Sequence, residues 1–133
     1  MRYLLDTNVV SALVRDPRGP VTARITEVGE TNVCTTVIVA AELSYGAAKK
    51  GSRRLADQLE AVLTALDVLP LEPPVDTTYG ELRARLERAG RPIGGNDLLI
   101  AAHALTLEHT LVTANEREFA RVTGLGVENW LRE

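Results

Sequence analysis

Short apolar runs alternate with stretches of helical periodicity along the chain. Tyr3, Leu4 and Leu5 form an apolar run that stops at a polar turn, after which apolar residues recur every three or four positions. The pattern predicts strands at residues 3–5, 33–36, 68–71, 110–113 and 127–130. Strands that alternate with helices are typical of an α/β protein with a mainly parallel sheet.

The helical stretches cover residues 9–14, 21–28, 39–50, 55–66, 79–86, 98–105 and 116–122. Pro20 suits a first helical turn, Ser52 and Asn96 are predicted N-caps, and Gly29 and Gly90 are predicted to close helices. We find no linker or internal repeat. We therefore predict one domain over residues 1–133, a three-layer α/β/α sandwich whose mainly parallel central sheet has four to five strands.

Composition narrows the classes of protein that this chain can be. The single cysteine, Cys34, excludes a disulfide framework and a cysteine-based zinc cluster. No apolar run is long enough for a membrane span or a secretory signal, so we expect a cytoplasmic protein that does not bind membranes. Aromatic residues make up 4% of the chain, too few for an extended base-stacking platform.

The net charge of −3 does not by itself favour a nucleic-acid partner. Four acids gathered in one metal site would, however, leave the remaining surface slightly positive. One stretch, called here the basic segment, holds four cations and no acid: Lys49, Lys50, Arg53 and Arg54. It is either a solvated helix face or a contact for RNA phosphates.

Three acids occur where the carboxyl ends of parallel strands would converge. Asp6 closes the first strand, Asp97 begins a helix after a glycine-rich loop, and Glu42 interrupts an apolar helical run. Two carboxylates about 5 Å apart repel by roughly 3 kcal/mol at an effective dielectric near 20. A hard cation relieves this repulsion, and oxygen-only ligands favour Mg²⁺ or Mn²⁺.

Each acid also has a purely structural interpretation. Asp6 could cap the following helix, Asp97 could favour a helix N-terminus, and Glu42 could lie at an exposed edge. We expect Glu42 on a buried face together with Ile38, Val39 and Tyr45, where an unpaired carboxylate is costly.

The motifs for several common enzyme classes are missing. We expect His103 to be a helix-packing or a surface residue, because it has no metal-ligand partner nearby in the sequence. Phosphate-binding loop, zinc-protease and α/β-hydrolase motifs are absent.

Four segments together carry a resemblance to a known family. They are residues 4–8 (LLDTN), 41–47 (AELSYGA), 93–104 (IGGNDLLIAAHA) and 111–119 (LVTANEREF). In order and spacing they resemble the four motifs of PIN-domain ribonucleases, and more narrowly those of the VapC toxins of type II toxin–antitoxin pairs. The likeness covers nearly the whole chain.

The resemblance assigns roles to individual residues. The family's three principal acids correspond to Asp6, Glu42 and Asp97, with Asp6 and Asp97 as the main metal ligands. Glu118 is the preferred fourth acid over Glu116, because Asn115 stands where many members have an aspartate. The supporting polar residues implied by the motifs are Thr7, Asn8, Thr113 and Asn115.

The implied activity is metal-dependent endoribonuclease action by a toxin that inhibits translation or growth. Mg²⁺ (or Mn²⁺) would polarise the scissile phosphate, while Glu42 would orient or deprotonate the attacking water. Whether one or two metal ions act is left open. Attack by external water predicts 5′-phosphate and 3′-hydroxyl ends, with single-stranded or loop RNA as substrate.

The implied partners are proteins as well as RNA. A small VapB-like antitoxin is expected to lay its C-terminal segment across the site, and an inserted arginine would suit the acids. A homodimer and a toxin–antitoxin hetero-oligomer are also expected.

Other classes of protein fit the sequence less well. A haloacid-dehalogenase-like phosphatase needs a carboxylate where Asn8 stands, and a receiver domain needs a late lysine that residues 110–133 lack. The competing function is a catalytically silent PIN-like module that binds RNA or protein.

Overall fold

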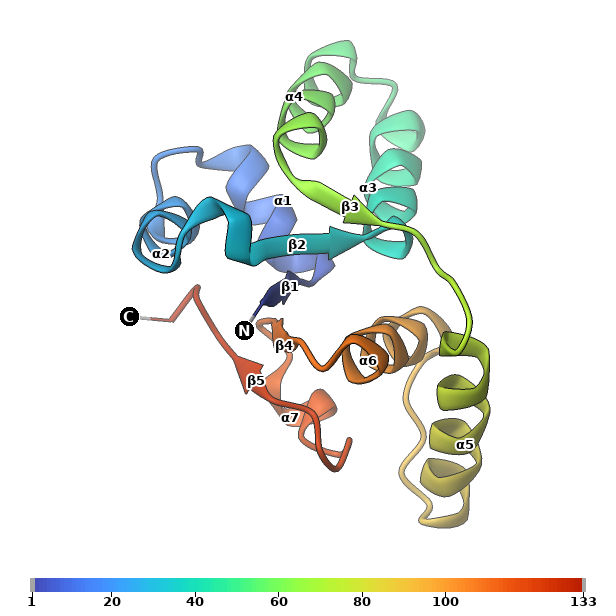
Figure 1. The fold of residues 1–133 in the computed structure, drawn as a ribbon. Helices are drawn as coiled ribbons and strands as arrows, with labels where there is room; N and C mark the ends of the chain where they lie inside the picture. The colour runs from blue at the N-terminus through green and yellow to red at the C-terminus, as the bar shows by residue number, and fades with distance from the viewer. Residues whose placement is uncertain (1, 133) are drawn as a thin grey trace.

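Five short parallel strands form the centre of the molecule (Figure 1). The computed structural model describes residues 2–132. The strands are β1 (Tyr3–Leu5), β2 (Val33–Thr36), β3 (Asp67–Leu69), β4 (Thr110–Val112) and β5 (Val127–Glu128). Their order in the sheet is β3-β2-β1-β4-β5, and all four neighbouring pairs are parallel. The predicted fold class is confirmed, because the sheet is flanked by helices.

Seven α-helices and one short 3₁₀ helix connect the strands in the described chain. They are α1 (Thr7–Arg15), α2 (Pro20–Val28), η1 (Glu30–Asn32), α3 (Val37–Lys50), α4 (Arg53–Ala65), α5 (Val75–Arg88), α6 (Gly95–Leu107) and α7 (Glu116–Phe119). As predicted, Pro20 lies in the first turn of α2 and Ser52 is the N-cap of α4. Gly29 and Gly90 follow their helices with positive φ. None of the described helices combines the length and the apolar character that a membrane crossing requires.

The N-cap prediction for Asn96 is wrong. Gly94 occupies the N-cap position of α6, without a side-chain capping bond, and Asn96 lies within the first turn. The reason is that the glycine-rich loop turns into the helix two residues earlier than the sequence suggested. The Asn96 side chain is thereby freed to reach another element, as described below.

Four predicted elements are shorter than their sequence patterns, and one of them, β4, ends at Val112 instead of Thr113. β3 ends at Leu69 because Pro70 has no N–H group to donate to a neighbouring strand. α7 ends at Phe119 because the next residues bond three positions back, as in the pair from Val122 N to Phe119 O at 3.1 Å. β5 ends at Glu128, since the Asn129 side chain accepts from Leu131 N and turns the backbone.

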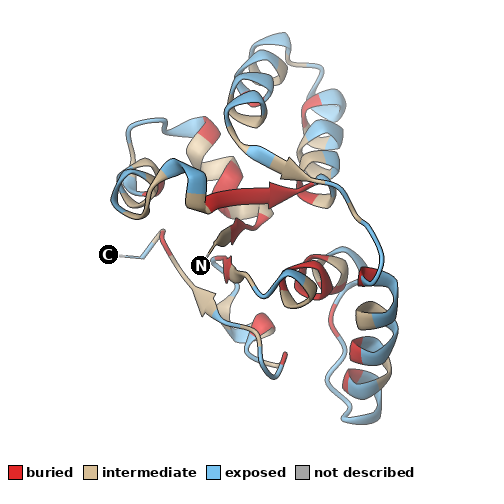
Figure 2. Cartoon of the chain, viewed as in Figure 1, coloured by how far each residue is buried: buried red, intermediate tan, exposed pale blue. Residues whose placement is uncertain are grey.

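The core lies on both faces of the sheet and beneath α6. Leu4 and Leu5 on β1 and Leu111 on β4 are fully buried, and all of β2 is buried (Figure 2). α6 buries residues around most of its circumference, which explains its nearly uninterrupted apolar sequence. This packing fixes the carboxyl ends of β1, β2 and β4 beside one another. Asp6 follows β1 directly, Glu42 lies on α3 after β2, and Asp97 lies in the first turn of α6, the helix that precedes β4.

Candidate active site

Asp6 is held rigidly at the end of the central strand. It is 2% exposed, caps α1 by accepting from Thr7 N at 2.8 Å through Oδ1, and accepts from Thr113 Oγ1 at 2.7 Å through Oδ2. Burial raises the pKa of Asp6, and the nearby Glu42 and Glu118 charges add to this, against the lowering effect of the two hydrogen bonds. The capping role and a place in an acidic site therefore coexist in one residue.

Glu42 approaches Asp6 from α3. Its Oε1 accepts from Thr7 Oγ1 at 2.6 Å, and its Oε2 faces Asn96 Nδ2 at 3.4 Å. Thr7 thus links the two carboxylates, because its backbone N–H donates to Asp6 and its hydroxyl donates to Glu42. The sequence did not single out the Asn96 contact, whose only signal was the position of Asn96 beside Asp97.

The buried face expected around Glu42 is wrong in one respect. Tyr45 is 67% exposed, and the buried residues of α3 are Val39 and Ala47. Glu42 itself is half-buried and lies at the rim of the site, within reach of solvent. The face of α3 that packs against the other elements carries Val39 and Ala47, and Tyr45 lies outside it.

Asp97 is paired with another acid. It lies in the first turn of α6 and shares a side-chain hydrogen bond with Glu118 of α7. Burial, this hydrogen bond and the charges of Glu118, Asp6 and Glu42 raise the pKa of Asp97 to about 7. A carboxyl–carboxyl hydrogen bond requires a proton on one partner, so the metal-free pair holds a proton at acidic to neutral pH.

The structure separates the two candidates for the fourth acid. Glu118 interacts with both Asp97 and Asp6, whereas Glu116 pairs with Arg132 at 3.1 Å and accepts from Asn129. The preference for Glu118 therefore agrees with the geometry.

The remaining polar residues of the motifs connect α1 to the loop after β4. Asn8 Oδ1 accepts from Ala114 N at 3.1 Å, and Thr113 Oγ1 accepts from Asn115 N at 3.0 Å. Thr113 thus donates to Asp6 while its own oxygen is held by the following loop. Asn115 is exposed at the edge of the site.

His103 packs within the fold, in agreement with the sequence interpretation. It is 2% exposed, and its Nδ1 lies 2.8 Å from Thr36 Oγ1. Thr36 also caps α3 by accepting from Ile38 N at 3.3 Å, so its hydroxyl hydrogen is free for the histidine. Burial, with a smaller effect of His109, lowers the pKa of His103. This neutral contact ties α6, which carries Asp97, to the start of α3, which carries Glu42.

The donor set fits a hard cation by its chemistry. It consists of carboxylate oxygens, and burial, together with the charges of the neighbouring acids, raises the pKa of Asp6 and of Asp97. Within residues 2–132, no three His, Cys, Asp or Glu side chains form a ready-made cluster around one point. Mg²⁺ commonly takes only one or two carboxylates and keeps several waters, so a site of this kind would not need three protein ligands around one point.

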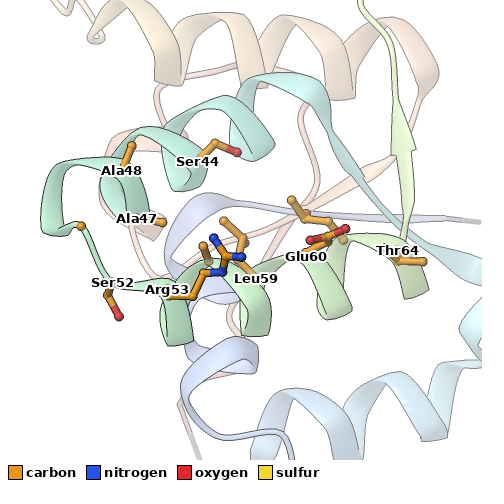
Figure 3. Close-up of a pocket in the computed structure, with 11 residues that line it drawn as sticks. Ser44, Ala47, Ala48, Ser52, Arg53, Leu59, Glu60 and Thr64 are labelled. Carbon is orange, nitrogen blue, oxygen red and sulfur yellow. The ribbon is translucent and has the colours of Figure 1, made fainter.

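The basic segment is exposed at the far end of α3 and the start of α4. Lys49 Nζ lies 5.9 Å from the centroid of the Tyr45 ring, and Arg53 forms a loose 3.8 Å ion pair with Asp57. Lys50 and Glu42 both line a cavity of about 270 Å³ that also borders α1 and α4. A second cavity, of about 600 Å³, lies between α3 and α4, with Ala47 and Leu59 among its lining residues (Figure 3).

Comparison with known proteins identifies the class that this fold and site define. The PIN domain family matches residues 3–125, so the chain is a PIN-domain protein. It is 39% identical over 132 residues to Ribonuclease VapC2 of Rickettsia felis, covering 98% of each chain. It is 36% identical over 132 residues to the tRNA(fMet)-specific endonuclease VapC of Shigella flexneri, again covering 98% of each chain.

Solved structures of toxin–antitoxin complexes agree with this class. The toxin fold of VapBC2 from Rickettsia felis, bound to a promoter DNA fragment, matches with a TM-score of 0.89 and 36% identity over 98% of this chain and 99% of that one. VapBC-1 from nontypeable Haemophilus influenzae matches with a TM-score of 0.84 and 34% identity over 99% and 100% of the two chains. The chain belongs to the VapC family, the ribonuclease toxins of VapBC toxin–antitoxin systems.

Proposed function

We propose that this VapC chain is a divalent-metal-dependent endoribonuclease whose metal ligands are Asp6 and Asp97. The observation that carries the proposal is the gathering of these two acids with Glu42 and Glu118 from four separate elements, with raised pKa values for Asp6 and Asp97. A fold gains nothing in stability from such repulsion, whereas a Mg²⁺- or Mn²⁺-binding site requires the negative charge.

The residues around the site divide the chemical work. Thr7 N and Thr113 Oγ1 orient both oxygens of Asp6, which fixes the direction of its lone pairs. Glu42 keeps one oxygen on Thr7, and its second oxygen has only a long contact with Asn96, so it can accept a proton from the attacking water. When bound, the cation supplies Lewis acidity towards the scissile phosphate.

Asp97 and Glu118 link metal binding to proton release. Because their shared proton occupies an oxygen that a cation would need, it must leave before Asp97 can act as a ligand. Glu118 then supports the charged site from α7. Attack by water would leave 5′-phosphate and 3′-hydroxyl ends on the RNA.

The test is cleavage of RNA by the purified chain, free of antitoxin, with Mg²⁺ or with excess chelator. Initiator tRNA is the first substrate to try, since one relative bears the name of a tRNA(fMet)-specific endonuclease. Glu118→Gln is expected to lower cleavage, and Glu116→Gln is the matched control, because Glu116 is tied to Arg132 instead of the acids. A chain that binds RNA but never cuts it would support the silent-module alternative.

The toxin–antitoxin complexes among the structural relatives support a protein partner. We propose that a VapB-like antitoxin lays its C-terminal segment over the cavity that Glu42 and Lys50 line, and places an arginine against the acids. A synthetic peptide of that segment should inhibit cleavage, and exchange of its arginine for alanine should abolish inhibition.

The expected homodimer, the toxin–antitoxin hetero-oligomer and the cytoplasmic site of action belong to the same proposal. Light scattering of the chain alone and of the chain with its antitoxin tests the two assemblies. Fractionation of cells tests the location.

A further inference from the structure

Tyr45 is the most exposed large apolar side chain in the described part of the protein. Its exposed fraction is 67%, against 42% for Val37 and 37% for Leu107. The sequence alone placed this residue in the interior. The ring lies one turn from Glu42 and is open to solvent, so a ligand bound at the acids can reach it.

The ring belongs to a stripe that leads away from the acids. Glu42, Tyr45 and Lys49 are spaced by three and then four residues, which places them on one face of α3. Along the helix axis, Tyr45 is about 4.5 Å and Lys49 about 10.5 Å beyond Glu42. The Lys49 ammonium lies 5.9 Å from the ring centroid, so the cation and the ring already adjoin.

This sequence of groups complements a single strand of RNA. A strand whose scissile phosphate lies at the acids presents its next base and its next phosphate within the following several ångströms. The flat face of a tyrosine accepts any base by stacking, and a lysine beside it neutralises a phosphate.

A second copy of this chain is a poorer fit to the same surface. Lys49 and Lys50 end the helix immediately beyond Tyr45 and are exposed. Lysine is depleted from the cores of protein–protein interfaces, whereas it is common where nucleic-acid backbones bind.

We propose that Tyr45 stacks on the base next to the scissile phosphate and that Lys49 binds the phosphate beyond it. The assignment rests on the proposed RNA-cleaving function, which it extends by naming a subsite. It predicts a contact that requires a base but tolerates any base, because every base has a π-face. It assigns the phosphate contact to Lys49 and not to Arg53, because Arg53 lies at the start of α4 and pairs with Asp57.

The experiment measures binding of fluorescein-labelled oligouridylate and of an abasic strand with the same number of phosphates. The full chain carries Asp97→Asn so that the RNA stays uncut. Tyr45→Leu keeps the apolar bulk but removes the ring, Tyr45→Phe keeps the ring, and Val37→Ala is the control for loss of an exposed apolar group on α3.

The expected result is that Tyr45→Leu weakens binding of oligouridylate by about fivefold or more. Tyr45→Phe and Val37→Ala should leave that affinity unchanged, and all variants should bind the abasic strand equally. Equal binding of oligouridylate by the leucine variant, or an equal loss on both strands, would overturn the proposal. A changed oligomeric state of the leucine variant in light scattering would assign the ring to a second copy and would also overturn it.

Failure of the wider function gives a different readout. Cleavage by the chain without Asp97→Asn is assayed separately with Mg²⁺ and with chelator. Absence of cleavage there refutes the nuclease proposal, while a base-dependent loss of binding in Tyr45→Leu still supports the stacking contact.

Discussion

Replacement of Asp97 by asparagine should stabilise the metal-free protein at neutral and alkaline pH while abolishing its RNA cleavage. In the folded chain the pKa of Asp97 is raised from 3.8 to about 7 by burial, by the hydrogen bond with Glu118 and by nearby negative charge. Between pH 3.8 and about 7, the folded state therefore holds a proton on Asp97 that the unfolded state has lost. Stability falls as pH rises from 3.8 towards about 7, and the penalty is then constant.

The size of the effect follows from the two pKa values. At 1.36 kcal/mol per unit, the difference sets a ceiling of about 4 kcal/mol at alkaline pH. Asp97 is only partly buried, so water and counterions screen its charge and reduce this to about 1–2 kcal/mol. For a domain of this length the gain corresponds to roughly 3–8 °C in Tm. Asparagine can also donate to Glu118, which retains the contact between α6 and α7.

The assay is thermal unfolding of both proteins in chelator, followed by circular dichroism from about pH 4 to about pH 8. The variant should melt higher than the wild type at the alkaline end, and the two curves should converge at the acidic end. Excess Mg²⁺ should then raise the Tm of the wild type more than that of the variant. Identical melting of the two proteins across the whole range would refute the assignment of Asp97 to a charged cluster.

Four further outcomes are expected. RNA cleavage should stop in excess chelator, and cleavage at an equal rate there would contradict the metal requirement. Asp6→Asn should abolish cleavage yet keep a native circular dichroism spectrum, because the amide oxygen can still accept from Thr7 N and the amide nitrogen can donate to Thr113 Oγ1; unchanged cleavage would count against the site. Exchange of all four basic-segment residues for glutamine should weaken RNA binding and make it less dependent on salt, while slow cleavage survives at high RNA concentration. An identical salt dependence of the two proteins would show that this surface does not contact the RNA backbone. His103→Ala and Thr36→Val should each cost about 1–3 kcal/mol in urea unfolding, and strict additivity in the double variant would deny their hydrogen bond.

The sequence was most informative where a signal is local. An apolar run followed by a polar turn defined β1, and Asp6 stands at that junction. A run of β-branched and small residues defined β2. Asp6 and Asp97 were found because each is the first acid after a strand or a glycine-rich loop. Glu42 was found because a charge interrupts an apolar run.

The contacts between distant segments could not be obtained in this way. The pairing of Asp97 with Glu118 depends on how α6 and α7 approach each other, and the contact of Asn96 with Glu42 depends on where α6 begins. The exposure of Tyr45 depends on which face of α3 packs against the other elements, and the buried residues of this helix are Val39 and Ala47. Periodicity gives the faces of a helix but does not say which face is covered.

The order of strands in the sheet also governs when, during its synthesis, this chain can become a nuclease. β1 is made first but lies between β2 and β4, and Asp6 takes one of its two hydrogen bonds from Thr113, 107 residues later. Glu118 is made later still. A chain that ends before β4 therefore lacks the Thr113 bond to Asp6 and lacks Glu118, so the four acids can gather only after nearly all of the domain has been translated.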